Sequence, residues 1–253
     1  MGCDELFQTR ELSQATAESA FNCYKTDLTT LSDREQKAHS LNRMSYLKFF
    51  IAEYHLDEKE PSLLEAINFA ENSILLFGSK YSIPEYLKLS DTERVTLAEG
   101  LYNYGLATSR YIDIKGQREA IKRMEDIKRS MNSIIRIKEE GTAFYGAHRT
   151  LGIFHMKVPY VAGGRIGLSK QYLQTVLENT RYQGDLSLYP ANNIAYADLM
   201  YKLENNQEAC RHLKLVTDLT PEDVRAMNNG LYLETLQSIK DGERLSSLRK
   251  CLE

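Results

Sequence analysis

Residues 190–223, PANNIAYADLMYKLENNQEACRHLKLVTDLTPED, decide the fold that this sequence predicts. Residues suited to packing recur in both halves of this stretch with the spacing of one face of a helix. The packing positions of the first helix fall on Asn193, Tyr196, Ala197 and Met200, and those of the second fall on Ala209, Leu213, Val216 and Pro221. The stretch therefore predicts two amphipathic helices, each of which must bury one face against a neighbour.

The spacing of these positions is typical of the tetratricopeptide repeat, a unit of about 34 residues made of two antiparallel helices. A single pair leaves a hydrophobic face exposed, so it must stack on neighbouring pairs, and the stack forms a curved surface suited to binding. The sequence therefore predicts an all-α fold, a right-handed superhelix of about four tetratricopeptide-like helix pairs with additional terminal helices.

Looser copies of the pattern precede this stretch. The nearest has packing positions at His148, Leu151, Gly152 and His155, and then at Ser169, Leu173, Val176 and Leu177. An insertion at 157–161 separates its two helices, and Pro159, Gly163 and Gly164 end the first of them because proline cannot donate a backbone hydrogen bond and glycine favours turns. Earlier pairs are predicted at Leu101, Tyr104, Gly105, Ala120, Met124 and Ile127, and at Met44, Leu47, Ile51, Ala66, Ala70 and Ile74.

The chain shows no proline-rich, serine-rich or low-complexity linker, so we expect one domain over 1–253. Within it we expect a cap helix at 1–34, the helix pairs at 35–223 and capping helices at 224–253. Strand signals are weak, and 80–84 and 184–189 are the predicted extended connectors.

The charge balance of the chain is slightly acidic, with 32 Lys and Arg against 35 Asp and Glu, so it favours no nucleic-acid partner. One segment, 115–138, carries basic residues every seven positions on one helix face, at Lys115, Lys122, Arg129 and Arg136. We interpret this face as a solvated outer surface. The alternative is an anionic partner or lipid headgroup.

The first residues, Met1-Gly2-Cys3, resemble the end of a bacterial lipoprotein signal, which predicts a lipid anchor at Cys3 and a periplasmic location. A coincidental cysteine is the alternative. For Cys23, Cys210 and Cys251 we favour buried, unpaired thiols, and Cys210 with Cys251 is the one pair worth testing as a disulfide. The cysteine and histidine spacings match no zinc motif, so no metal is expected.

Catalytic motifs are absent from the sequence, including HExxH, GxSxG, GxGxxG and the phosphate-binding P-loop. His148 and His155 share a helix face, but both occupy packing positions, which favours interior histidines over a general base. We therefore expect a non-enzymatic binding protein without a cofactor.

The repeat pattern also predicts which residues line a groove. The first helix of each pair contributes them, and the candidate ligand-binding residues are Tyr102, Arg110, Arg149, Met156, Lys157, Asp198, Tyr201 and Lys202. This mixture of apolar, aromatic and charged side chains suits a small organic molecule oriented by a few polar groups. Arg149 is the sharpest candidate because a guanidinium can bind a carboxylate through two hydrogen bonds, and a salt bridge between helices is the alternative.

The run YGAHRTLG at 145–152, followed by Pro159, Gly163 and Gly164, resembles the T-component family associated with TRAP transporters, and Gly146, Arg149 and Gly152 match it best. Asn228 or Asn229 also stands where that family has an asparagine, and the resemblance covers roughly 95–250. It implies a periplasmic lipoprotein of degenerate tetratricopeptide pairs that binds a substrate-binding protein and a small, hydrophobic organic ligand, with self-association around a pore. The alternative function is a scaffold for a peptide or another envelope protein.

Overall fold

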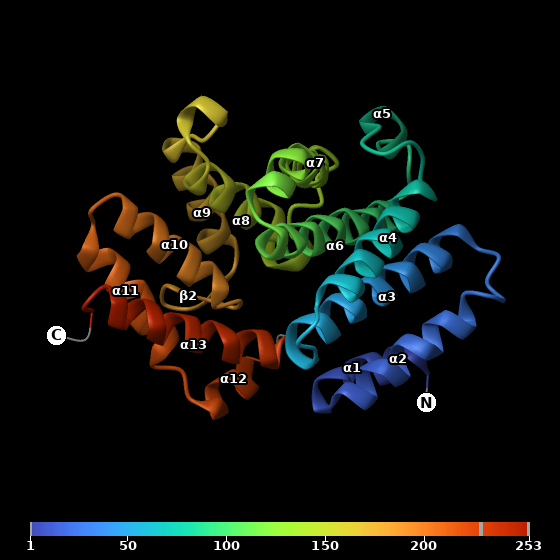
Figure 1. Cartoon of the computed structure of the whole chain (residues 1–253), viewed down its shortest axis with the longest axis horizontal. Helices are drawn as coiled ribbons and strands as arrows, with labels where there is room; N and C mark the ends of the chain where they lie inside the picture. The colour runs from blue at the N-terminus through green and yellow to red at the C-terminus, as the bar shows by residue number, and fades with distance from the viewer. Residues whose placement is uncertain (1, 228–229, 252–253) are drawn as a thin grey trace. The chain divides into compact units, whose positions relative to one another are not determined.

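The computed structural model describes residues 2–227 and 230–251 and is almost wholly helical, which confirms the predicted all-α fold of packed helix pairs (Figure 1). Its contacts divide the chain into two compact units, Met1–Ala143 and Phe144–Glu253. The single superhelix over 1–253 and its right-handed sense stay predictions. Asn228 and Asn229 lie outside the described residues.

Unit 1 is a stack of long helices. α3 (Arg34–His55) packs on α4 (Glu60–Leu75), α4 on α6 (Asp91–Lys115), and α6 on α7 (Gln117–Arg136). These are the two earlier predicted pairs, and most of their packing positions, including Leu47, Ile74, Leu101 and Ile127, are buried, whereas Ala120 and Met124 are only partly buried. The N-terminal segment differs from the single cap helix predicted for 1–34, since it forms α1 (Cys3–Gln8), the 3₁₀ turn η1 (Arg10–Leu12) and α2 (Gln14–Asp27).

Local capping signals explain where these helices begin. The Ser90 hydroxyl accepts a hydrogen bond from the backbone N–H of Glu93, and the Glu93 carboxylate accepts one from the backbone N–H of Ser90. This reciprocal pair satisfies two N–H groups that the first turn of α6 leaves without helical partners. Asp33 caps α3 through a single bond, in which its carboxylate accepts from the backbone N–H of Gln36.

Unit 2 contains the stretch that decides the fold. It comprises α8 (Thr142–Lys157), the 3₁₀ turn η2 (Tyr160–Ala162), α9 (Ile166–Asn179), α10 (Ala191–Lys202), α11 (Asn206–Thr217), α12 (Pro221–Met227) and α13 (Tyr232–Leu248). The predicted pair at 190–223 is confirmed as α10 and α11, whose packing residues Tyr196, Met200, Ala209 and Leu213 are buried. Pro221, the last predicted packing position, is instead exposed and begins α12. Met156 and Leu173, from α8 and α9, share one apolar cluster with α10.

The two predicted connectors differ in outcome. Residues 184–189 belong to a short antiparallel hairpin of β1 (Arg181–Gln183) and β2 (Leu186–Ser187), as an extended connector predicts. The prediction for 80–84 is wrong at its end, because α5 (Ile83–Tyr86) begins there. Its first turn holds Pro84, whose fixed backbone angle suits the start of a helix.

The cysteines correct two predictions. Cys3 is bonded to Cys23 and Cys210 to Cys251, so the preference for unpaired thiols is wrong and the one pair considered from the sequence is formed. A lipid anchor would occupy the sulfur of Cys3. That sulfur is already bonded to Cys23, so the predicted lipidation site is wrong for this structure.

Candidate functional site

A cavity of about 580 Å³ opens in unit 2 where the C-terminal ends of α8 and α10 meet the start of α11 and the residue that follows α13. Five of the predicted ligand-binding residues line it together. The lining consists of Met156, Lys157, Asp198, Tyr201, Lys202, Glu204, Asn206 and Arg249. Cavities of this size hold small organic ligands.

One side of the cavity is built from Tyr201, Arg249 and Asp198. The Arg249 guanidinium lies over the Tyr201 ring, 4.2 Å from its centre, and forms an ion pair with the Asp198 carboxylate. Only 11% of the Arg249 side chain is exposed, whereas Tyr201 is 43% exposed. The aromatic ring therefore faces solvent while the arginine beside it is held in a defined position.

Another part of the lining joins Lys202 to the end of α8. The Lys202 ammonium donates a hydrogen bond to the backbone carbonyl of Met156, one of the last carbonyls of α8, which have no helical partner. An ammonium has three N–H donors, so this contact leaves two for a ligand. Lys157 adds a second exposed cation, and buried Met156 adds apolar surface.

The charges of the lining favour an anion. Lys157, Lys202 and Arg249 are cations, whereas Asp198 and Glu204 are carboxylates, so the cations exceed the carboxylates by one. Because Asp198 already holds Arg249, a ligand carboxylate would meet a positioned guanidinium and two lysines. An aromatic ring and a methionine beside them suit an organic anion with an apolar part.

Arg149 lies elsewhere, in the interior of unit 2. It is 8% exposed, donates a hydrogen bond of 2.7 Å to the Asn192 side chain and lies over the Tyr189 ring at 4.6 Å. Neither predicted partner, a ligand carboxylate nor an acidic residue of another helix, is the acceptor of this bond. The acceptor is the side-chain amide oxygen of Asn192, which belongs to α10. Arg149 therefore joins α8 to α10 and does not line the cavity.

Tyr102 and Arg110 belong to unit 1 and are not in this cavity. Tyr102 is 8% exposed and so does not present its ring to solvent. The Arg110 guanidinium donates to the Glu53 carboxylate at 2.7 Å and lies 3.7 Å from Asp113. Both residues pack or pair within α3 and α6, which gives them a structural role in unit 1.

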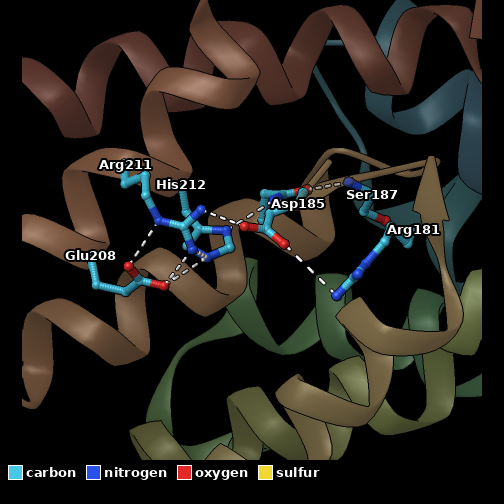
Figure 2. Close-up of polar contacts among 7 residues, drawn as sticks. Arg181, Asp185, Ser187, Glu208, Arg211 and His212 are labelled. Carbon is cyan, nitrogen blue, oxygen red and sulfur yellow. Dashed lines mark hydrogen bonds and ion pairs between the residues drawn. The ribbon is translucent and has the colours of Figure 1, made fainter. Parts of the chain in front are cut away.

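A polar network fastens the hairpin to α11 (Figure 2). The Arg211 guanidinium donates to Glu208 at 2.6 and 2.9 Å and to Asp185 at 2.5 Å, and Arg181 lies 3.8 Å from the same aspartate. The hydrogen bonds from Arg211 lower the pKa values of the Asp185 and Glu208 carboxyls. Ionised carboxylates on both sides of Arg211 thus connect α11 to the tip of the hairpin.

His212 lies beneath this network and is 2% exposed. The side-chain oxygen of Asn193 accepts a hydrogen bond from the backbone N–H of Ser187, and its amide nitrogen donates one to the backbone carbonyl of Asp185, both at 2.8 Å. Its nitrogen therefore also donates to His212 Nδ1, at 3.0 Å, which assigns the imidazole proton to Nε2. Nε2 lies 3.2 Å from the Glu208 carboxylate, which can accept this proton, and 3.1 Å from the Arg211 guanidinium, which cannot. Burial, with the nearby Arg211 charge, lowers the pKa of His212 and so favours the neutral imidazole.

His148 and His155 are both 8% exposed, which confirms the predicted interior positions. His155 stacks on Tyr172 of α9 with ring centres 5.9 Å apart, and His148 meets the same ring edge-on at 5.6 Å. These contacts join α8 to α9 within one pair.

In the described part of the chain, the ligand atoms of Cys3, Cys23 and Asp27 lie within 4.8 Å of one another. Both cysteine sulfurs belong to a disulfide, and a disulfide sulfur lacks the thiolate charge that binds a metal. The group is therefore not a metal site in the oxidised protein. Among the described residues, no helix is long and apolar enough to span a bilayer.

Arg249, Glu204 and Asn206 are the cavity residues that the repeat pattern missed. Glu204 and Asn206 flank the turn between α10 and α11, outside the packing positions. Arg249 follows α13, two residues before Cys251. The bond from Cys251 to Cys210 brings that segment to α11, so this cysteine pair was the signal that could have located Arg249.

Comparison of the sequence with the models of known protein families, and with curated proteins, finds no match.

Proposed function

We propose that the chain is a non-enzymatic binding protein that holds a small organic anion, with an apolar part, in the cavity of unit 2. The observation that supports this proposal is the convergence of Lys157, Lys202 and Arg249 around Tyr201 and Met156. Arg249 would bind the anionic group, Lys202 would add a second donor, and Tyr201 would cover the apolar part.

The compartment is part of the same proposal. Two disulfides are expected in an oxidising compartment, which supports the cell envelope and the periplasm in particular. With the resemblance of 145–164 to the T-component family, this suggests an accessory component of a TRAP transporter that receives its ligand from a substrate-binding protein. Co-purification of such a protein from solubilised envelope is the expected result.

Calorimetric titration with octanoate, benzoate and succinate tests the cavity. Arg249→Ala should weaken binding at least roughly tenfold, because it removes a charge-assisted hydrogen bond and leaves the Asp198 carboxylate facing the ligand. Asp198→Asn should bind as tightly as the wild type or more tightly, because it removes a competing anion. If Arg249→Ala binds like the wild type, the cavity is not the ligand site.

Lys214→Ala is the matched control, since it removes one exposed cation from α11 outside the cavity. It should leave the affinity unchanged. Equal losses in Lys214→Ala and Lys202→Ala would indicate attraction by overall charge and would contradict a defined site.

Binding of a peptide is the second candidate function. Exposed Tyr201 beside Arg249 favours it, because aromatic and arginine side chains dominate protein interfaces. A short acidic peptide that binds more tightly than each carboxylate, with the same loss in Arg249→Ala, would support the scaffold over the small-ligand carrier.

A further inference from the structure

Residues 157–170 comprise the last residue of α8, the connection at 158–165 and the start of α9, and they expose several apolar side chains. We call this segment the α8–α9 tip. Tyr160 is 74% exposed and Val161 is 95% exposed, and Ile166 and Leu168 follow at 39% and 40%. The central part of the tip, 158–165, connects the ends of the two helices within unit 2 (Figure 1).

These exposed side chains belong to a turn that is closed by backbone hydrogen bonds. The N–H groups of Gly163 and Gly164 donate to the carbonyls of Tyr160 and Pro159, each at 3.0 Å. The N–H of Arg165 donates to the backbone carbonyl of His155, at 3.1 Å. Gly163 has a φ of 96°, and a Cβ on Gly164 would lie 1.7 Å from the Val158 carbonyl oxygen. Glycine is therefore required at both positions of the turn.

Arg165 braces the tip from the side. Its guanidinium donates to the carbonyls of Tyr160 and Gly164, at 3.0 and 2.8 Å, and lies 4.0 Å from the centre of the Tyr160 ring. The turn thus holds Tyr160 and Val161 outward without a large loss of freedom on binding, which favours association.

Charge around the tip is one-sided. No Asp or Glu occurs from 141 to 177, although the chain contains 35 of them. Lys157, Arg165 and Lys170 are exposed, and none has a carboxylate partner within ion-pair distance among the described residues. The tip is therefore a site of uncompensated positive charge.

The basic face predicted at 115–138 gives the contrast, although this segment is not one helix, because Gly116 divides it between the end of α6 and α7. Lys115 pairs with Glu60 at 2.9 Å, Lys122 with Glu119 at 2.7 Å, and Arg129 with Glu125 at 3.4 Å. Most of that face is neutralised, as a solvated outer surface predicts. At the α8–α9 tip, by contrast, cations without a carboxylate partner lie beside exposed apolar side chains, which is the combination that an anionic lipid surface binds.

We propose that the α8–α9 tip is a peripheral contact site for an anionic phospholipid surface. Val161 would enter the boundary of the acyl chains, the Tyr160 ring would lie at the headgroups, and Arg165, Lys157 and Lys170 would face the phosphates. A bilayer fits better than a protein partner, because a few protruding side chains bury too little area for a stable protein interface. This proposal does not depend on a ligand in the cavity.

Co-sedimentation of the oxidised, full-length protein with vesicles tests the proposal. The protein should bind vesicles of phosphatidylcholine mixed with phosphatidylglycerol and should bind vesicles of phosphatidylcholine alone much more weakly. Raising the salt concentration should release it, because the attraction is partly electrostatic. Equal binding to both kinds of vesicle, or binding to neither, would overturn the proposal.

Two variants identify the site. Val161→Asp should reduce vesicle binding at least roughly tenfold, since it places a charge at the apolar tip. Lys170→Glu should reduce it at least roughly fivefold, and Lys214→Glu on α11, with the same change in charge, should have a smaller effect. Because these side chains are exposed, helical content by circular dichroism should not change.

A final comparison separates the tip from the cavity. Val161→Asp should retain octanoate binding while it loses vesicles, and Arg249→Ala should show the reverse. Glycerol phosphate tests whether a free headgroup alone binds: if it displaces the protein from vesicles and Val161→Asp still binds vesicles, the cavity holds the headgroup and the tip proposal is wrong.

Discussion

At the scale of single residues, buried polar groups set the chemistry of unit 2. Asn193 is fully buried, and its two backbone contacts orient its amide, so the amide determines which nitrogen of His212 carries the proton. A protonated His212 would direct an N–H at the amide nitrogen of Asn193, and both groups are donors. The native structure therefore disfavours the charged imidazole.

We predict that this residue makes the protein less stable in mild acid. The pKa of His212 is lowered in the folded state, so below its ordinary value of 6.5 the unfolded chain binds a proton that the native state does not. The free energy of unfolding should fall with pH by at most about 1.4 kcal/mol per pH unit from this group. The loss should precede the titration of Glu208, whose ordinary value is 4.5.

Urea denaturation at several pH values measures this effect. His212→Gln keeps a buried donor and acceptor but cannot titrate, so its stability should depend less on pH than that of the wild type. The same pH dependence in both proteins would show that His212 is not the responsible group.

At the scale of elements, the close approach of α8 and α9 depends on Gly152. A Cβ at this position would lie 2.6 Å from Cγ of Leu173, and the Ser169 hydroxyl donates to the Gly152 carbonyl at 2.8 Å. The branch point of a leucine cannot move away as freely as the end of a long side chain, so the helices would have to separate.

Gly152→Ala should therefore destabilise the protein. Overpacking costs about 1–3 kcal/mol, which exceeds the gain of about 1 kcal/mol that alanine brings within a helix. Gly167→Ala in α9 is the matched control, because no atom lies within 4 Å of its added Cβ, and it should raise stability by up to about 1 kcal/mol. Denaturant midpoints that shift in the same direction for both variants would contradict the close contact.

At the scale of the whole molecule, each unit carries one disulfide. Cys3–Cys23 joins α1 to α2 in unit 1, and Cys210–Cys251 joins α11 to the segment after α13 in unit 2. The second bond also positions Arg249, two residues away, beside the cavity. Stability and ligand binding in unit 2 are therefore linked through the same covalent bond.

We predict that removal of the two bonds has different consequences. From the sequence separations of 20 and 41 residues, loop entropy gives losses of about 3 kcal/mol for Cys3→Ser with Cys23→Ser and about 4 kcal/mol for Cys210→Ser with Cys251→Ser. Guanidinium denaturation measures both. Only the second pair of substitutions should also weaken octanoate binding, because only Cys251 tethers Arg249, and equal affinity in both variants would contradict that link.

Much of the fold could be predicted because repeat packing is local. The spacing of Tyr196, Met200, Ala209 and Leu213 determines which helix faces must be buried, and neighbouring segments of the chain bury them. The candidate ligand-binding residues at the ends of α8 and α10 could be predicted as one group because these helices are neighbours in the same repeat stack. Lys157, Tyr201 and Lys202 lie near helix ends that meet within one compact group of helices.

Periodicity along the chain predicts the helix pairs and part of the cavity lining. It does not predict every helix boundary, because 115–138 is divided between α6 and α7. Three pairings depend on the tertiary structure. Arg149 donates to the buried Asn192 amide, Arg249 lines the cavity, and Cys3 is bonded to Cys23. Such pairings depend on distances between residues far apart in sequence, and a helical pattern specifies which face is buried but not which partner it meets.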